Sequence, residues 1–346
     1  MTDDNGVGAT ARSDSPEQLR ILLSVPAHEL QAMFPAETRA ALDELGEVVE
    51  HDPDDLADPA AFRAALAGVQ VAITAWGFPR LDAARLADAP DLRFVMHAAS
   101  SLRALTSDDF WATGIPVSQA GAAMSPAVAE LSLAFTMALL RRTHRTDHAL
   151  RSGGDWWEAR LTPRAREIRG SRIGVVGASR TGRDYLELVT ALGAEVMVFD
   201  PYIPEGDPLR AVQRDLDGLL RDSEVLALHA PATEETRGML GATELAKLRD
   251  GALVVNTARA ELLDADALYA EVESGRIDAA LDVFEAEPLD DRWRRLPNVL
   301  VTPHLGGATV ESRRRAGRIV VEEIRRFVGG VPLRYALTRA DVERMG

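Results

Sequence analysis

Six short apolar runs in the second half of the chain constrain its fold more than any other feature of the sequence. They are separated by segments with helical spacing, and they occupy residues 172–176, 195–199, 225–228, 253–256, 279–283 and 299–302. Short strands that alternate with helices form parallel sheets whose two faces the helices cover. The pattern therefore predicts a doubly wound α/β sheet, in which the clearest helix covers residues 265–273.

A second, shorter α/β series precedes these runs. A helix is expected at residues 37–45 and a turn at residues 76–79, and strands are expected at residues 19–24, 69–74, 92–97 and 115–117. The whole chain has 346 residues and 46% hydrophobic content, which is enough for two domains with separate cores. We therefore expect two α/β units.

A long apolar helix should connect the two series. Ser125 is a favourable N-cap residue and Pro126 suits the first helical position, so the helix should begin there and end near Arg141 and Arg142. An irregular segment should follow at residues 153–170. The last helix, residues 310–328, is long enough to return to the first unit, where residues 331–333 could pair with its sheet.

Composition excludes several classes of function. The net charge of −15 argues against a nucleic acid partner, and the absence of cysteine excludes disulfides and thiolate chemistry. No spacing of His, Asp and Glu suggests a metal site. The longest apolar run, residues 127–140, contains Glu130 and is too short to span a bilayer, and no signal peptide is visible before it. We expect a soluble, cytoplasmic protein without a membrane partner.

A glycine turn follows the first of the six runs and is suited to a dinucleotide. Gly177 and Gly182 bracket it, although Ser179 stands where a second glycine usually lets the backbone approach a pyrophosphate. The following helix N-terminus offers free N–H groups to phosphate. Asp200 ends the next strand, where a carboxylate bonds the ribose of NAD and repels the 2′-phosphate of NADP. An ordinary glycine turn, or a methyltransferase, would share these features.

Three residues after later strands carry the expected chemistry. Arg259 supplies a planar, forked donor for the carboxylate and carbonyl of a 2-keto acid, and His304 can donate a proton near neutral pH. Glu287 would raise the pKa of that imidazole and orient it. Taken singly, each could be a surface or turn residue. Together, at strand ends beside a nicotinamide, they indicate reduction of a keto acid.

The chain resembles the D-isomer-specific 2-hydroxyacid dehydrogenase family over roughly residues 20–335. The motifs that carry the resemblance are VAE at 128–130, RGSRIGVVG at 169–177, LHAPAT at 228–233, VNTAR at 255–259, LDVFEAEP at 281–288 and TPHLGG at 302–307. The resemblance implies a Rossmann NAD domain, residues 121–307, inserted into a smaller flavodoxin-like substrate domain, residues 17–120 and 308–346. Residues 1–16 would be a flexible tail.

The resemblance also implies roles for individual residues. Arg259 would bind substrate, His304 would be the general acid/base, and Glu287 would support it. The substrate site would add Trp76, Ser100 and Ser101. The NAD(H) site would contain Gly177, Ser179, Arg180, Thr181, Gly182, Asp200, His229, Pro231, Thr257, Ala258, Asp282, Gly306 and Gly307.

The chain departs from the family pattern at three places. Ser179 replaces a turn glycine, Ala260 replaces the glycine that normally follows the catalytic arginine, and the substrate loop at residues 98–102 has no glycine. Two alternatives remain open: a non-catalytic NAD-binding partner protein on the same fold, and an NAD dehydrogenase that oxidises formate or phosphite. Neither the side chain of the keto acid nor the direction of the reaction in the cell follows from the sequence.

The remaining expectations concern the other histidines and assembly. His97 should belong to a strand and His229 should bond backbone near the cofactor, while His28, His51, His144 and His148 should lie at the surface. The apolar helix after Pro126 and the exposed pair Trp156-Trp157 predict a homodimer formed through the cofactor domain.

Overall fold

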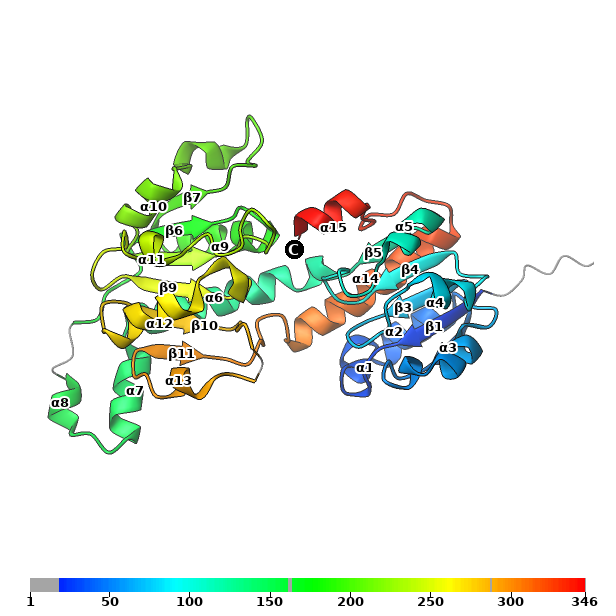
Figure 1. Ribbon diagram of the computed structural model, residues 1–346, viewed down its shortest axis with the longest axis horizontal. Helices are drawn as coiled ribbons and strands as arrows, with labels where there is room; N and C mark the ends of the chain where they lie inside the picture. Colours follow the sequence, from blue (N-terminus) through cyan, green and yellow to red (C-terminus); the bar gives the residue numbers. More distant parts are fainter. Residues whose placement is uncertain (1–18, 161–163, 287, 346) are drawn as a thin grey trace, which may run out of the picture.

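The chain forms two α/β bodies, each built on one parallel sheet (Figure 1). In this computed structural model, the described residues are 19–160, 164–286 and 288–345. The expected tail, residues 1–16, lies outside them. The predicted fold class is confirmed by the two sheets, while the domain boundaries at 120/121 and 307/308 remain predictions.

The first sheet has the strand order β2-β1-β3-β4-β5, which is the flavodoxin-like order. Its strands are β1 (Arg20–Ser24), β2 (Glu47–Glu50), β3 (Val71–Thr74), β4 (Phe94–His97) and β5 (Val117–Gln119). The helices among them are α1 (Ala27–Met33), α2 (Ala36–Asp43), α3 (Pro59–Leu66), α4 (Ala83–Ala87) and α5 (Asp108–Thr113). Direction along the sheet reverses between β1 and β3, so the loops after β1 and β3 flank this switch point, and the loop after β4 is the next one along the same edge.

The second sheet has the order β11-β10-β9-β8-β6-β7, with the reversal between β6 and β8. Its strands are β6 (Arg172–Val176), β7 (Glu195–Phe199), β8 (Val225–Leu228), β9 (Leu253–Asn256), β10 (Asp278–Leu281) and β11 (Val299–Val301). The helices of this body are α6 (Ser125–Leu140), α7 (Thr143–Arg151), α8 (Trp156–Arg160), α9 (Arg180–Ala191), α10 (Leu216–Asp222), α11 (Ala242–Leu245), α12 (Ala265–Glu273) and α13 (Asp291–Arg294). Such a doubly wound sheet was predicted from the six apolar runs.

Alternation along β6 shows why both faces of this sheet are covered. Ile173 and Val175 are buried in one apolar cluster with Phe135 of α6, whereas Val176 belongs to a second cluster with Leu268 of α12. Burial of large aliphatic side chains on both faces stabilises a parallel sheet.

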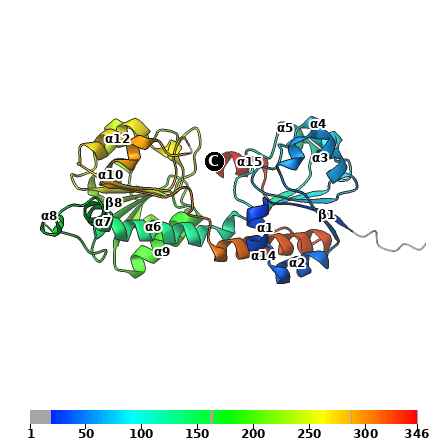
Figure 2. The same cartoon turned by 90° about the horizontal axis from the view of Figure 1, so that it is seen from below.

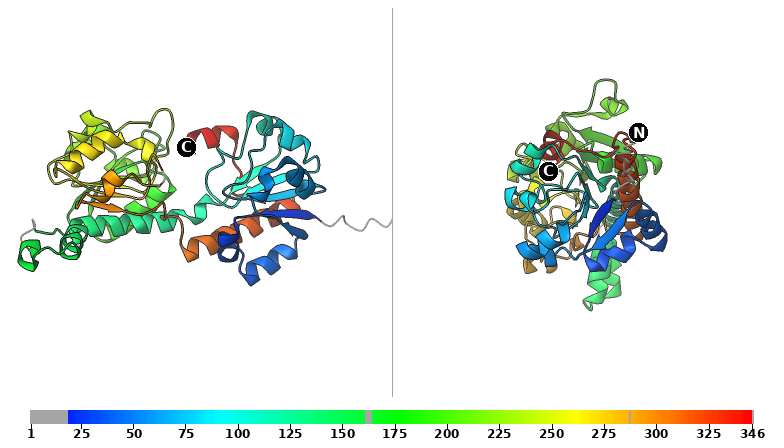
Figure 3. Two further views of the ribbon diagram at one scale, coloured as in Figure 1. Left: turned by 60° about the horizontal axis from the view of Figure 1, so that its bottom comes forward. Right: turned by 90° about the vertical axis from the view of Figure 1, so that its right-hand side faces the viewer.

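Two long helices connect the bodies. In Figure 2, α6 lies along one face of the second sheet, and α14 (Val310–Val328) continues in the same layer along the face of the first sheet. The helix α15 (Arg339–Met345) lies near the loops between the two sheets (Figure 3). The prediction that Ser125 is the N-cap of α6 is wrong. Met124 occupies the N-cap position and Ser125 is the first helical residue. The Ser125 hydroxyl donates a hydrogen bond to Asp184 Oδ2 at 2.6 Å.

Three further expectations need correction. Residues 153–170 were expected to be irregular, yet α8 lies within them, and residues 161–163 are outside the described part. Residues 331–333 form no strand; instead Ala336 makes an antiparallel bridge to Ser118, because the chain first turns at Gly330. Several short helices of the first body were missed since they span too few turns to show a period.

His144 is buried rather than at the surface. Its Nε2 lies 3.1 Å from Asp278 Oδ2, and Arg145 Nε donates to the same oxygen at 2.8 Å. These partners overcome the cost of burying Asp278 and lower the pKa of its carboxyl to about 2. Sequence patterns could not reveal this cluster, because its members come from α7 and β10, which are far apart in the chain.

Candidate active site

The carboxyl ends of neighbouring strands in the second sheet are level. In the parallel register, Val176 is paired with Leu228, Leu228 with Asn256, Asn256 with Leu281, and Leu281 with Val301. The residues that follow these ends are therefore brought to one edge of the sheet: Gly177, His229, Thr257 and Asp282. In open α/β sheets this edge is where ligands bind.

The glycine turn after β6 is packed too closely for side chains. Gly177 has φ +97°, and a Cβ on it would lie 2.5 Å from the Ala230 nitrogen of the loop after β8. A Cβ on Gly182 would lie 2.2 Å from the Gly177 carbonyl oxygen. Both glycines let the chain turn tightly into α9, whose first turn contains the predicted Arg180 and Thr181. The turn thus fits a dinucleotide phosphate at a helix N-terminus.

Ser179 caps the helix that follows. It has extended backbone angles, and its Oγ accepts a hydrogen bond from Gly182 N at 3.2 Å. The hydroxyl proton stays available as a donor. Asp200, directly after β7, accepts from Ala178 N at 2.7 Å and from Tyr202 N at 2.8 Å. Its carboxylate is thereby fixed against the same turn.

The Ser179→Gly variant is expected to bind NADH with a dissociation constant within about threefold of the wild type, roughly 0.7 kcal/mol. The hydroxyl serves the helix end, and glycine is itself tolerated at an N-cap at a cost of a few tenths of a kcal/mol. Fluorescence titration with NADH measures this. Tightening by tenfold or more would show that the serine obstructs the pyrophosphate. Ser179→Ala is the matched control, since it keeps the Cβ and removes the cap.

The prediction that the His229 side chain bonds the backbone is wrong. The side chain is buried, neither of its ring nitrogens has a hydrogen-bond partner among the described residues, and its ring packs at 5.0 Å from that of Tyr185. Burial lowers the pKa of its imidazole to about 3, so the ring is neutral at physiological pH. It lies against the glycine turn, with its Cβ 3.1 Å from a Cβ built on Gly182.

Arg259 is half-buried in the loop after β9. Asn256 shapes this loop: its Nδ2 donates to the Arg259 carbonyl at 2.8 Å and its Oδ1 accepts from Ala258 N at 3.0 Å. Arg259 Nη1 donates to the Ala258 carbonyl at 2.7 Å, and the guanidinium forms no ion pair with any described residue. Burial lowers the pKa of Arg259, the neighbouring Glu261 raises it, and the positive charge of Arg103 lowers it further.

His304 sits in a loop that Asp282 organises. Asp282 Oδ1 accepts from Thr302 Oγ1 at 2.5 Å and from Leu305 N at 2.8 Å, and its Oδ2 accepts from Gly306 N at 2.8 Å. His304 N donates to the Asp282 carbonyl at 2.9 Å. The histidine takes φ +54°, a left-handed conformation that is uncommon for a side-chain residue and is held by these bonds.

Asp282 was predicted to lie along the nicotinamide. Both of its carboxylate oxygens are used on the His304 loop, which is a role that the sequence did not reveal. Glu287, the predicted partner of His304, lies outside the described residues. The remaining cofactor residues follow strands of the same sheet: Thr257 Oγ1 lies 2.6 Å from Ser132 Oγ of α6, and the Pro231 carbonyl accepts from Thr236 Oγ1 at 2.6 Å.

The first sheet contributes the loops after β3 and β4. Trp76 follows β3 and is 41% exposed, with the Arg313 guanidinium 4.8 Å from its ring centroid. Arg313, on α14, also pairs with Glu29 at 2.6 Å and donates to the Gly307 carbonyl at 3.0 Å. This buried arginine, which sequence reasoning missed, therefore connects Trp76 to the loop that contains His304. Ser100 and Ser101 lie in the loop after β4, as predicted.

Comparison with known proteins identifies similar sequences. Residues 133–306 match the family model described as D-isomer specific 2-hydroxyacid dehydrogenase, NAD binding domain. The hydroxypyruvate reductase of Thermotoga maritima is 39% identical over 222 residues, which cover 62% of this chain and 71% of that protein. The D-3-phosphoglycerate dehydrogenase of Archaeoglobus fulgidus is 31% identical over 269 residues, or 76% of this chain, but the match spans only 50% of that longer protein.

Comparison of structures agrees at the level of the fold. The structure of D-2-hydroxyisocaproate dehydrogenase superposes with a TM-score of 0.82, covering 92% of this chain and all of that one at 22% identity.

Proposed function

The chain belongs to the D-isomer specific 2-hydroxyacid dehydrogenases, and from that premise we propose that it reduces a small 2-keto acid to the D-2-hydroxy acid with His304 as the proton donor. Membership makes it an NAD-dependent oxidoreductase of small 2-hydroxy and 2-keto acids. The observation that carries the finer proposal is the arrangement at one sheet edge, where Arg259 and the His304 loop follow strands beside the glycine turn.

The residues divide the work as follows. NAD(H), when bound, supplies or accepts the hydride at carbon 2 of the substrate. Arg259 binds the substrate carboxylate and the carbonyl oxygen through its forked N–H groups. His304 donates a proton to that oxygen as the carbonyl is reduced, so 2-keto acid, NADH and one proton give 2-hydroxy acid and NAD⁺. Asp282 holds the histidine loop in position.

The direct test follows NADH oxidation at 340 nm with a series of 2-keto acids, and analyses the product on a chiral column. We expect turnover with at least one of them and D-configured product. Absence of turnover with every 2-keto acid, together with tight NADH binding, would favour the non-catalytic alternative. Turnover with formate or phosphite and NAD⁺ would favour the other dehydrogenase alternative.

Asp200 should give the enzyme a preference for NADH over NADPH. Its carboxylate, held beside the turn by Ala178 N, would face the 2′-phosphate of NADPH, and placing like charges side by side costs several kcal/mol. We expect kcat/KM to favour NADH by about tenfold or more, ~1.4 kcal/mol. Asp200→Asn keeps a hydrogen-bond acceptor and removes the charge, so it should reduce the difference in kcat/KM between NADH and NADPH. Equal kcat/KM with the two cofactors in the wild type would refute the proposal that Asp200 faces the ribose.

We further propose a homodimer formed through the cofactor domain. Trp156 and Trp157 of α8 are 59% and 67% exposed, and α7 and α8 project from that body in Figure 1. Exposed aromatic area of this kind usually marks an interface. Light scattering at micromolar concentration should give about twice 37.5 kDa.

Substitution of Trp157 tests where the dimer forms. Trp157→Glu is expected to shift the mass toward that of a monomer, because a carboxylate is costly in an apolar interface. Val328→Glu, an equally drastic change at an exposed site at the end of α14, should leave the dimer intact. A monomeric wild type would overturn the proposal. The cytoplasmic location likewise stays a prediction.

A further inference from the structure

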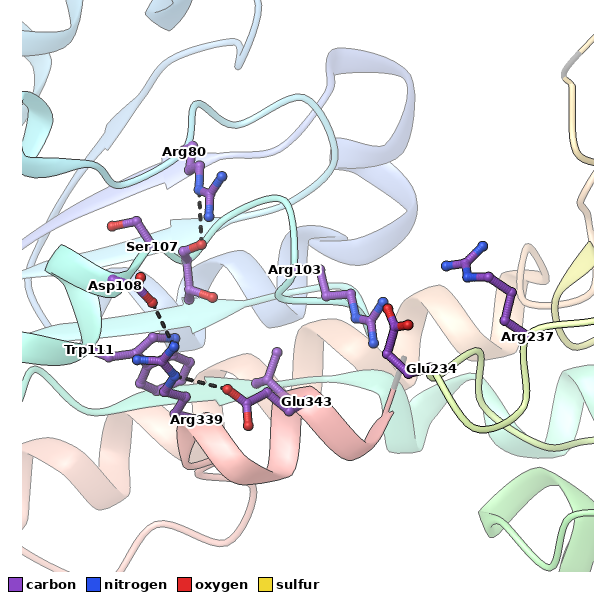
Figure 4. Close-up of a pocket in the computed structure, with 11 residues that line it drawn as sticks. Arg80, Arg103, Ser107, Asp108, Trp111, Glu234, Arg237, Arg339 and Glu343 are labelled. Carbon is purple, nitrogen blue, oxygen red and sulfur yellow. Dashed lines mark hydrogen bonds and ion pairs between the residues drawn. The ribbon is translucent and has the colours of Figure 1, made fainter. Parts of the chain in front are cut away.

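A pocket of about 440 Å³ opens where the two bodies face each other. It is lined by the loop after β4, the loop after β8 and α15, and four arginines and three carboxylates contribute to its wall. In Figure 4, Arg103 extends from the first body toward Glu234 of the second, and Arg237 extends toward the same space from the far side. The two bodies thus supply its charged groups together.

The positive charges of this pocket are poorly compensated. Arg339 pairs with Asp108 at 2.8 Å and with Glu343 at 2.9 Å, which uses two of the three carboxylates. The side chains of Arg103 and Arg237 form no hydrogen bond or ion pair with any described residue. About half of the other described arginines form ion pairs, whereas these two line one pocket without a bonded partner, which is the arrangement expected of a site for an external anion.

One wall of the pocket, at Arg103, lies close to the proposed substrate site. Arg103 directly follows the predicted substrate loop, residues 98–102, and its charge acts on the Arg259 guanidinium. The β8 loop is fastened to the segment after Arg259, because Gly238 N donates to the Glu261 carbonyl at 2.7 Å. Arg237 directly precedes Gly238, so this hydrogen bond holds Arg237 near the Arg259 loop. A substrate whose carboxylate is held by Arg259 would extend toward these arginines.

We propose that this pocket binds a second anionic group, a carboxylate or a phosphate, at the far end of the 2-keto acid, with Arg103 as the residue that selects for it. The proposal rests on the proposed function and adds the substrate class: a 2-keto acid with two acidic groups. Arg237 contributes from the opposite wall. Glu234 lines the same pocket from the second body, where its negative charge opposes binding of that anion.

A purely structural role for Arg103 makes a different prediction. If Arg103 only attracted Glu234 to hold the two bodies together, removing either charge would weaken turnover of every substrate by the same factor. If Arg103 binds the substrate, removing it harms only substrates with a second anion. Removing the Glu234 charge then has the opposite effect, since Glu234 competes with that anion.

The test compares kcat/KM for five 2-keto acids with NADH. Pyruvate and 2-oxobutyrate carry one acidic group, oxaloacetate and 2-oxoglutarate a distal carboxylate, and 3-phosphohydroxypyruvate a distal phosphate. The wild type should prefer at least one of the last three by about tenfold or more over the first two. The preferred member identifies carboxylate or phosphate.

The variants assign the preference to residues. Arg103→Met should lower kcat/KM for the preferred substrate by about 10- to 100-fold, the range expected for a charge-assisted contact, and leave pyruvate within about threefold. Glu234→Gln should raise kcat/KM for the preferred substrate. Arg318→Met, at an exposed position on α14 outside the pocket, is the matched control and should change neither.

Two results would overturn the inference without touching the proposed function. One is a wild type that reduces pyruvate or 2-oxobutyrate as well as any diacid. The other is an equal loss for all substrates in Arg103→Met and Glu234→Gln, which would assign the pair to contact between the bodies. Failure to reduce any of the five acids would instead count against the proposed function itself.

Discussion

Replacing His304 with asparagine is expected to lower kcat by about 10²–10⁴-fold while the dissociation constant of NADH stays nearly unchanged. The imidazole is the proposed proton donor to the substrate carbonyl, and asparagine cannot supply a proton at neutral pH. Asparagine is the better first choice because His304 has φ +54°, a conformation that asparagine tolerates more readily than alanine. Stopped-flow turnover and NADH fluorescence measure the two quantities separately.

His304→Ala and His148→Asn complete this experiment. The alanine variant should lose activity to the same extent, whereas His148, which is exposed on α7, should be replaceable without effect. More than a tenth of wild-type kcat in both His304 variants would remove the histidine from the mechanism. A loss of NADH binding would instead indicate damage to the loop that Asp282 holds.

The second large effect is expected for Arg259. Arg259→Gln should lower kcat/KM by about 10²–10⁴-fold, since two charge-assisted hydrogen bonds to the substrate, each worth roughly 1.5–3 kcal/mol, would be lost. KM should rise and kcat should fall, because the guanidinium binds the substrate carboxylate in the ground state as well as in the transition state. Initial rates over a wide range of keto acid concentration separate the two parameters.

Arg259→Lys provides the conservative comparison. Lysine retains the charge but not the planar fork, so activity should recover only in part. The backbone of the loop should survive both changes, because Asn256 bonds the Arg259 carbonyl rather than its side chain. Full activity in Arg259→Lys would mean that the site needs a positive charge without bidentate geometry.

Periodic features of the sequence predicted the fold well. The helices α12 and α14 have the predicted bounds, and the strands of the second sheet agree within two residues at each end, because long or strongly apolar segments show their period clearly. Short helices such as α4 span too few turns to show a period, and they were not predicted. The N-cap of α6 was misassigned because Ser125 bonds Asp184, a partner 59 residues away that local patterns cannot reveal.

The candidate site was predictable in its residues but not in its support. Motifs identified Arg259 and His304 together with the strands before them. The roles of Asn256, Asp282 and Arg313 depend on which backbone groups the fold brings near each side chain, and no spacing in the sequence encodes that. The position of Arg103 was equally hidden, since no motif in the sequence records that the fold brings Arg103, Glu234 and Arg237 to one pocket.

The two sets of bonds around His304 belong to different bodies. Asp282, at the end of β10, holds Leu305 and Gly306, whereas Arg313, packed against Glu29 of α1, holds the carbonyl of Gly307. A rotation of one body against the other would therefore pivot within this short stretch. In such a rotation, atoms close to the pivot move little and atoms far from it move most. The pocket wall that contains Arg103 and Glu234 would therefore open widely for substrate exchange, while His304, the proposed proton donor, would barely shift.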